Sequence, residues 1–275
     1  MSHKQTKGLK RNTIDKYYTK DTIVNLCISY IKQAIEIKPN DLIIEPSAGN
    51  GSFISAIKDL SNNYKFYDIQ PEHLEVIKQD YLLLKVDDIK SNFDNIHIIG
   101  NPPFGRQSSL VIKFIKQSCY FAKTISFILP KSFKKETLRN KFDLNYHLIY
   151  EIDLPKKAFL VDNDEYDVPC IFQIWIKKNY NRPEINKMEP VNFKFVKKTD
   201  NPDISFRRVG VYAGKIENII DDKNIQSHYF IKFLNNKSID DNIKILNKIT
   251  FDFNNTVGPK SISKQEIIIK FNDLL

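Results

Sequence analysis

The sequence predicts an α/β fold with a doubly wound, mostly parallel sheet. Short apolar runs such as residues 42–44 and 96–99 are typical of buried parallel strands, and they alternate with helical patterns. A glycine loop follows the first run, and Asn101 with two prolines follows the second. Open α/β sheets bind ligands at the carboxyl ends of their strands. We therefore expect a ligand site where these two segments meet.

The glycine loop at residues 45–53 separates a predicted strand from a predicted helix. Gly49 and Gly51 allow the backbone to approach a ligand closely. The loop lacks the full spacing of a dinucleotide fingerprint and the Lys-Ser/Thr pair of a phosphate-binding P-loop. By itself it predicts a ligand site without identifying the ligand.

Two acidic residues follow the glycine loop in order. Asp68 ends a second predicted strand, 65–68, at the place where such folds hold a ribose diol. We expect a helix over 71–78, and then Asp80 at the mouth of a third strand over 81–84, where it could accept a hydrogen bond from an adenine amine. Either acid alone would more often be a cap or a loop charge, but their order before Asn101 favours one shared site.

The segment Asn101-Pro102-Pro103-Phe104 suits chemistry on an exocyclic amine. The N6 lone pair of adenine is delocalised into the ring, so attack on a methyl donor requires acceptors on its two N–H bonds. The Asn101 side-chain oxygen and the Pro102 carbonyl could supply them, while the prolines fix φ and offer no competing donor. Phe104 would stack on the base. A turn built from Asn and two prolines is the alternative.

The order of these motifs resembles that of S-adenosylmethionine-dependent adenine-N6 DNA methyltransferases with the cofactor motif first, over roughly residues 15–178. The resemblance implies a Rossmann-like methyltransferase sheet of seven strands with an antiparallel last hairpin, which we place at 147–154 and 171–177 after a strand at 124–130. It implies S-adenosyl-L-methionine as the cofactor. The catalytic residues that it implies are Asn101, Pro102, Pro103 and Phe104.

The resemblance also implies which residues bind the cofactor. Tyr18 and Thr19, which open a predicted helix, would line its methionine end, Asp68 its ribose and Asp80 its adenine. The full set that we predict is Tyr18, Thr19, Glu45, Pro46, Ser47, Gly49, Asp68, Ile69, Asp80, Tyr81 and Asn101.

An aromatic residue near the last hairpin would contact the second face of the target base by the same resemblance. Phe159 is our choice and Tyr166 the alternative, and a ring that only covers the core would fit Phe159 equally well. Pro169-Cys170 mimics the nucleophile of cytosine-C5 methyltransferases, but Asn101 occupies the position after the strand where that cysteine would stand. We interpret Cys170 as a small buried hydrophobe.

Residues 179–275 are predicted to form a small C-terminal region, because the composition shifts to Asn, Lys and Pro near residue 179. Arg207 and Arg208 lie among aromatics and glycines, a mixture suited to contacts with a nucleic-acid backbone, although a basic solvated hairpin has the same composition. Helices expected near 239–246 and 267–274 would pack on the main domain, 17–178. Residues 1–16 are predicted to be a flexible basic arm.

Composition agrees with a nucleic-acid partner. The 275 residues carry a net charge of +9, which suggests a polyanionic partner, although an AT-rich genome also produces lysine-rich proteins. The cysteines and histidines show no metal-ligand spacing, so we predict no metal site. With no apolar run near the ~20 residues of a membrane span and no apolar signal core, we expect a soluble intracellular protein without a membrane partner.

We therefore predict methyl transfer to the N6 amine of adenine in nucleic acid, with DNA favoured over RNA, and with the base flipped or single-stranded. The C-terminal region is small for a DNA enzyme of this motif order, which keeps cap or structured RNA open as the substrate. Amide methylation of a protein glutamine, or a non-catalytic nucleic-acid-binding subunit of a methyltransferase complex, would also fit these motifs. A partner subunit is left open.

Overall fold

The chain divides into two compact units, Met1–Pro183 and Glu184–Leu275. The computed structural model describes residues 17–90, 92–162, 164–183, 187–251 and 260–275. The division falls shortly after the boundary that composition predicts near residue 179. The basic arm predicted at 1–16 lies outside the described residues.

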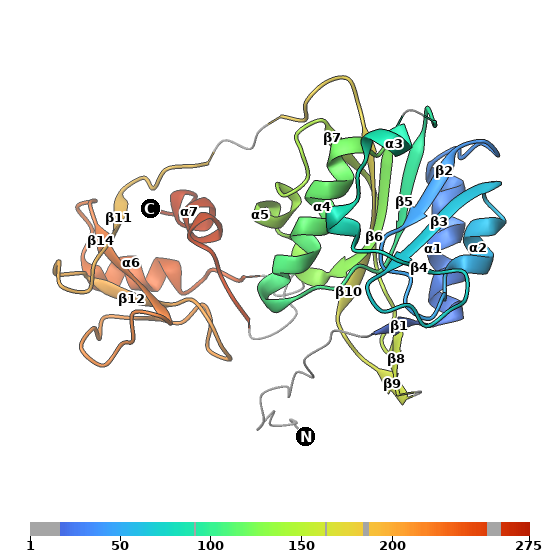
Figure 1. Cartoon of the computed structure of the whole chain (residues 1–275). Helices are drawn as coiled ribbons and strands as arrows, with labels where there is room; N and C mark the ends of the chain where they lie inside the picture. Colours follow the sequence, from blue (N-terminus) through green and yellow to red (C-terminus); the bar gives the residue numbers. More distant parts are fainter. Residues whose placement is uncertain (1–16, 91, 163, 184–186, 252–259) are drawn as a thin grey trace. The chain divides into compact units, whose positions relative to one another are not determined.

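A seven-stranded sheet forms the centre of the first unit (Figure 1). Five adjacent strands, from β4 to β6 in the spatial order below, are parallel to one another, and β10 runs antiparallel between β6 and β7. The predicted fold class, including the antiparallel last hairpin, is confirmed. The strands in spatial order are β4 (Ile77–Lys78), β3 (Asn63–Asp68), β2 (Leu42–Glu45), β5 (Ile96–Gly100), β6 (Thr124–Pro130), β10 (Cys170–Lys177) and β7 (Tyr146–Asp153).

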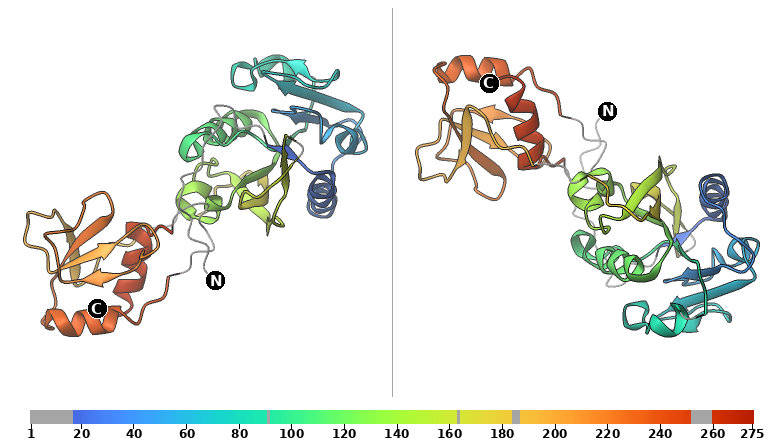
Figure 2. Two further views of the ribbon diagram at one scale, coloured as in Figure 1. Left: turned by 90° about the horizontal axis from the view of Figure 1, so that it is seen from below. Right: turned by 90° about the horizontal axis from the view of Figure 1, so that it is seen from above.

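Helices cover both faces of this sheet, because successive side chains of a strand point to opposite faces. Ile44 and Ile98 pack with α4 (Ser109–Phe121), whereas Ile43 and Ile99 pack with α1 (Asp21–Ala34). Figures 1 and 2 show α1 on one side of the sheet and α4 on the other. The shorter helices are α2 (Ile54–Lys58), α3 (Asp87–Lys90) and α5 (Glu136–Arg139), with 3₁₀ turns η1 (Tyr81–Leu83), η2 (Arg106–Ser108) and η3 (Lys131–Lys134).

A small antiparallel sheet holds the chain before α1 against a hairpin far along the sequence. β1 (Tyr18–Thr19) pairs with β8 (Phe159–Val161), which pairs with β9 (Asp164–Tyr166). The amide of Lys20 continues this pairing by donating to the carbonyl of Ala158 at 3.2 Å. Tyr18 and Thr19 therefore form a strand, and α1 begins only at Asp21.

The segment between β3 and β5 differs from the sequence prediction. The helix expected over 71–78 is absent there, and this segment ends in the edge strand β4. The strand expected over 81–84 is the 3₁₀ turn η1, because the Asp80 carboxylate accepts the Leu82 amide at 2.9 Å and caps that turn. Asp80 thus follows a strand, as expected, but the strand is β4.

The second unit has its own sheet and core. Its antiparallel strands lie in the order β11 (Phe193–Val196), β14 (His228–Phe233), β12 (Ile204–Arg207) and β13 (Ile216–Glu217). Helices α6 (Ile239–Leu246) and α7 (Lys264–Asn272) are present as predicted. The prediction that they pack on the main domain is wrong, because Leu246, Ile267 and Phe271 are buried in the core of their own unit.

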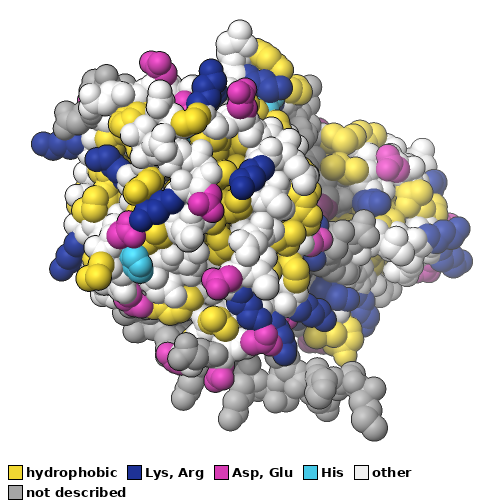
Figure 3. Space-filling view, turned by 90° about the vertical axis from the view of Figure 1, so that its right-hand side faces the viewer, with side chains coloured by type: hydrophobic (Ala, Val, Ile, Leu, Met, Phe, Trp, Pro, Cys, Tyr) yellow, Lys and Arg dark blue, Asp and Glu magenta, His cyan; other side chains and the backbone are white. Residues whose placement is uncertain are grey.

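Surface charge is mixed where Figure 3 displays it. On that face, lysine and arginine side chains are interspersed with acidic and apolar ones, so the positive net charge is not gathered there. Within the described part of the chain, no helix is both long and apolar enough to cross a membrane.

A buried polar network joins the amino ends of three central strands. The Asp41 carboxylate accepts from the Lys38 amide at 2.9 Å, from Asn95 Nδ2 at 2.9 Å and from His97 Nε2 at 3.2 Å. The second ring nitrogen of His97 lies 2.7 Å from Thr124 Oγ1. Burial alone would raise the pKa of Asp41, but these hydrogen bonds outweigh it and lower that pKa.

Replacing Asp41 should therefore destabilise the first unit. Asp41→Ala leaves the donors of Asn95 and His97 without an acceptor, which should cost about 1–3 kcal/mol in the free energy of unfolding measured with urea. Asp59→Ala, at an exposed carboxylate just after α2, is the control and should stay within about 0.5 kcal/mol. Equal losses for the two variants would contradict a structural role of the network.

Candidate active site

A cavity of about 630 Å³ lies where β2, β3 and β5 end. The loops that follow these three strands supply most of its wall, as expected for an open α/β sheet. The predicted residues that line it are Tyr18, Thr19, Glu45, Pro46, Ser47, Gly49, Asp68, Ile69, Asp80, Tyr81, Asn101 and Pro103. The structure therefore brings all the predicted cofactor residues to one cavity.

Two residues of the Asn-Pro-Pro-Phe segment lie outside the cavity wall. Pro102 is buried, and Phe104 is half-buried against the cores on both faces of the sheet. The Phe104 carbonyl accepts from the amides of Leu110 and Val111, at 3.2 and 3.3 Å. Phe104 thus holds the first turn of α4 in this structure, and its stacking on a base stays a prediction.

Phe159 is fully buried and does not line the cavity. Its ring meets the edge of Tyr17 with centroids 6.2 Å apart, and Tyr17 in turn stacks on Tyr166 at 5.5 Å. Tyr17 is the aromatic of this group that lines the cavity. The placement agrees with the core-covering alternative for Phe159 and does not support its contact with a base.

Sequence reasoning missed several lining residues that adjoin predicted ones. Leu110 and Phe114 lie one turn apart on α4, and their helical spacing was the signal that could have indicated a shared face. Glu72 and Arg106 lie in segments that carry no motif. The other missed residues are Tyr17, Ala48, Asn50, Ser52, Phe53, Gln70, Gln79, Leu82 and Gly105.

The Asp68 carboxylate shapes the glycine loop. One of its oxygens accepts from the Gly49 amide at 2.9 Å and the other from the Gln70 amide at 2.7 Å. Gly49 has φ +50°, a conformation that a glycine adopts without strain. Each carboxylate oxygen keeps further acceptor capacity, so Asp68 can bind hydroxyl groups of a ligand while it holds the loop.

At the edge of the cavity a tyrosine is tied to a carboxylate. The Tyr18 hydroxyl donates to Glu72 Oε2 at 2.5 Å, and burial together with Glu72 raises the pKa of Tyr18. Deeper in the wall, Tyr81 is buried, stacks on Phe114 at 5.4 Å and has its hydroxyl 2.8 Å from Ser118 Oγ. Tyr81 therefore serves as a fixed apolar wall.

Asn101 has its side-chain amide fixed at one end. Its Nδ2 donates to the Tyr17 carbonyl at 3.2 Å and to Thr19 Oγ1 at 3.3 Å. Its Oδ1 is buried and has no hydrogen-bond partner among the described residues. The Ser47 hydroxyl donates to the Asn101 backbone carbonyl at 3.2 Å. The site therefore presents a positioned acceptor that a ligand donor can satisfy.

Glu45 is the most deeply buried carboxyl of the cavity, with 2 % of its surface exposed. Its Oε2 has no hydrogen-bond partner in the described part of the chain. Burial, and then the negative charge of Asp68, raise the pKa of Glu45 well above its usual value. Gly100 lets the side chain lie close to β5, since a Cβ there would stand 3.1 Å from Glu45 Cγ.

The loop after Phe104 has an unusual backbone. Gly105, Gln107 and Ser108 have φ values of +68°, +53° and +62°. For a non-glycine residue this left-handed region costs about 1–2 kcal/mol. Gln107 and Ser108 do not line the cavity, but they directly follow Gly105 and Arg106, which do. The strain therefore lies next to the candidate site, and such strain is often found near functional sites.

Comparisons with known proteins add a methyltransferase relative. No family model matches the chain. Over 149 residues, or 49% of this chain, the sequence is 24% identical to Ribosomal RNA small subunit methyltransferase A of Malacoplasma penetrans. The match covers 53% of that protein, so the chain spans about half the length of this curated relative.

Two solved structures illustrate the similarity in fold. A type I restriction-modification system methyltransferase subunit from Streptococcus thermophilus is 17% identical, with a TM-score of 0.45 over 62% of this chain and 46% of that one. A dimethyladenosine transferase from Plasmodium falciparum is 16% identical, with a TM-score of 0.41 over 59% of this chain and 64% of that one. At these TM-scores we take the fold class from the strand order itself.

Gly105 should tolerate substitution less well than Gly49. Gly105→Ala places a Cβ 2.7 Å from Leu110 Cβ at φ +68°, whereas Gly49→Ala meets Tyr18 at an ordinary 3.5 Å and is disfavoured only by its φ of +50°. We expect Gly105→Ala to melt about 2–4 °C below Gly49→Ala, which corresponds to about 1 kcal/mol in a unit of this size. Equal melting temperatures in a thermal unfolding experiment would show that the α4 contact does not constrain this loop.

Proposed function

We propose that the chain is an S-adenosylmethionine-dependent methyltransferase that modifies the exocyclic N6 amine of adenine in a nucleic acid. The observation that carries the proposal is the geometry of Asn101. Its Nδ2 is engaged by Tyr17 and Thr19, so its buried Oδ1 is left as an acceptor beside the cavity. An amine with two N–H bonds is the kind of donor that this acceptor suits.

The residues of the cavity fit the proposed cofactor. Asp68 can bind ribose hydroxyls with its remaining acceptor capacity, and the glycine loop lets the backbone approach closely. Glu45 supplies an unpartnered buried oxygen where a positively charged ligand would be favoured. S-adenosylmethionine supplies an activated sulfonium methyl, so the protein mainly positions the amine and stabilises charge that develops on it.

In the proposed mechanism, Asn101 accepts a hydrogen bond from the amine and localises its lone pair. The bonds to Tyr17 and Thr19 keep the amide from rotating, because a flipped amide would place Oδ1 against the Tyr17 carbonyl, which is also an acceptor. No histidine is among the described residues that line the cavity. We infer that the amine proton leaves to water after transfer. A paired adenine cannot reach this cavity, which implies base flipping or a single-stranded substrate.

RNA is the second candidate substrate. The motif order favours DNA, but the curated relative from Malacoplasma penetrans is named a ribosomal RNA methyltransferase. A partner subunit and an intracellular location are predictions from the sequence.

To identify the substrate, we would incubate the full chain with isotope-labelled S-adenosylmethionine and duplex DNA, single-stranded DNA or total RNA, and then analyse the nucleosides by mass. Labelled N6-methyldeoxyadenosine or N6-methyladenosine (or its dimethyl form) would identify the substrate, and no label in any pool would contradict the proposal.

Asn101→Ala should abolish methyl transfer while cofactor affinity changes little. Loss of one preorganised acceptor is expected to lower kcat by about 100-fold or more. The dissociation constant for the cofactor, measured by isothermal titration calorimetry, serves as the control for an intact site. Unchanged turnover would contradict the catalytic role assigned to Asn101.

Cofactor binding should release protons from Glu45. Because burial and Asp68 raise the pKa of Glu45, its carboxyl binds a proton more readily in the free protein than an ordinary glutamate. A cationic ligand beside it favours the ionised form, so the pKa falls on binding and a proton leaves. Calorimetry in buffers of different ionisation enthalpy measures this release, which Glu45→Gln should remove. The same release from Glu45→Gln would assign it to another group.

A further inference from the structure

A second cavity, of about 420 Å³, lies in the C-terminal unit. Two loops form much of it, one joining β12 to β13 and the other joining β13 to β14. Its wall carries three cationic side chains and two carboxylates. The lining residues are Arg207, Tyr212, Lys215, Glu217, Asp222, Lys223, Asn224 and His228.

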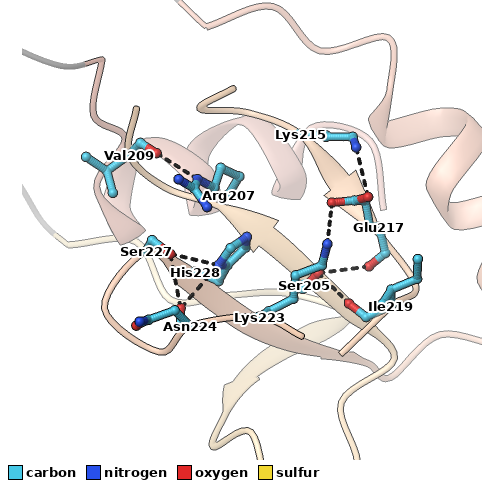
Figure 4. Close-up of polar contacts among 10 residues, drawn as sticks. All are labelled: Ser205, Arg207, Val209, Lys215, Glu217, Ile219, Lys223, Asn224, Ser227 and His228. Atoms are coloured by element: carbon cyan, nitrogen blue, oxygen red, sulfur yellow. Dashed lines mark hydrogen bonds and ion pairs between the residues drawn. The ribbon is translucent and has the colours of Figure 1, made fainter. Parts of the chain in front are cut away.

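The cationic side chains of this cavity contact other protein groups, but Arg207 and Lys215 keep hydrogen-bond donors that a ligand could use. Glu217 accepts from Lys215 and from Lys223, each at 2.8 Å, and these bonds lower the pKa of Glu217 to about 2 (Figure 4). Lys215 remains 58% exposed. Arg207 donates from Nε to the Val209 carbonyl at 2.9 Å, and its terminal guanidinium nitrogens have no partner in the described ranges. Arg207 and Lys215 can therefore bind an anion.

His228 adds a buried imidazole to the wall. Its Nδ1 lies 3.1 Å from the Asn224 carbonyl, to which it donates, and 3.1 Å from Ser227 Oγ (Figure 4). Burial lowers the pKa of His228, and the charges of Arg207 and Lys223 lower it further, against the opposing effects of the Asn224 bond and Glu217. An anion in the cavity would offset the repulsion from those cations. Lys215 and Asp222 are the remaining charged groups that line it.

Exposed apolar side chains lie on the two loops that form much of the cavity. Tyr212, in the β12–β13 loop, is 71% exposed and lines the cavity. Val211 stands beside it, and Ile219 and Ile225 are exposed in the β13–β14 loop. Proteins hold an unpaired strand with cations that bind its phosphates and exposed aromatic rings that stack on its bases, and Tyr212 is such a ring beside the cations.

Arg208, which the sequence pairs with Arg207, has a different placement. Its guanidinium lies over the Tyr229 ring at 5.1 Å and donates to the Tyr229 hydroxyl at 3.2 Å. It does not line the cavity. Lys215 and Lys223 line the cavity with Arg207 instead.

We propose that this cavity binds a backbone phosphate of a single-stranded nucleic-acid segment through Arg207 and Lys215, with Tyr212 stacking on a neighbouring base. The inference deepens the proposed function, since it assigns a substrate-binding site to the C-terminal unit. It does not depend on catalysis, because binding can be measured without cofactor and without methyl transfer.

The test is the affinity of the full chain for a fluorescein-labelled mixed-sequence single strand, as RNA and as DNA, measured by anisotropy at several salt concentrations. Losing one phosphate contact should make the negative slope of log K against log salt shallower by about 0.7, which is about a fivefold loss of affinity at 0.1 M salt. We expect this change for Arg207→Ala and for Lys215→Ala. Tyr212→Ala should weaken binding without changing the slope.

Lys194→Ala is the matched control. Lys194 is an exposed lysine on β11, at the opposite edge of the same sheet from β13, and the same charge is removed. Its affinity and slope should stay close to wild type. Equal losses for Lys194→Ala and Arg207→Ala, or wild-type affinity for both Arg207→Ala and Lys215→Ala, would overturn the proposal.

Glu217→Gln provides a variant with the opposite expected sign. Removing its charge releases Lys215 and Lys223 from their ion pairs, so affinity for the strand should rise severalfold. Weaker binding by a variant that melts like wild type would contradict the proposal. If wild type binds strands through this cavity but transfers no methyl group, the proposed function fails and this inference stands. If wild type transfers methyl groups and the variants bind strands as wild type does, the proposed function stands and this inference fails.

Discussion

The hydrogen bonds from the Asn101 amide to Tyr17 and Thr19 are the constraint on which the candidate site depends. They require the chain before α1 to lie beside the end of β5, and the pairing of β1 with β8 holds it there. An ion pair between Lys20 and Glu165 adds a second tie to the same hairpin. The acceptor on Asn101 is thus positioned by three segments that are far apart in the sequence.

Electrostatics distinguish the two ends of the central sheet. At the amino ends, the Asp41 carboxylate is satisfied by donors, and its pKa is lowered. At the carboxyl ends, Glu45 has an unpartnered oxygen in the described structure and a raised pKa. A buried polar group without a partner costs stability, which native proteins tolerate chiefly at functional sites. This contrast separates a packing network from the candidate site within one sheet.

The C-terminal unit supports a division of roles between the two parts of the chain. Its helices and sheet share a core of their own, so its loops can carry binding residues without disturbing the candidate active site.

The two adjacent arginines of this unit have different surroundings. Arg208 packs on Tyr229 within the unit, whereas Arg207 faces a cavity with Lys215. Neighbouring residues of an extended chain point to opposite faces, which explains why these arginines differ.

The sequence by itself determined the α/β class and the strand ends that form the site, because apolar runs and the residues just after them are local signals. Roughly half of the lining followed from the resemblance of its motifs to a known family. Only the tertiary structure decided the rest. Phe159 was placed in the core by the pairing of β8 with β1, and the segment 81–84 became a turn because Asp80 capped it. Lys215 and Lys223 were brought together at Glu217 across two loops. The pairing of β1 with β8 joins segments far apart in the chain, and such a contact leaves no periodicity in a single sequence. The Asp80 cap and the ion pairs of Glu217 are local, but they depend on the path of the backbone, which the order of apolar and charged residues does not specify.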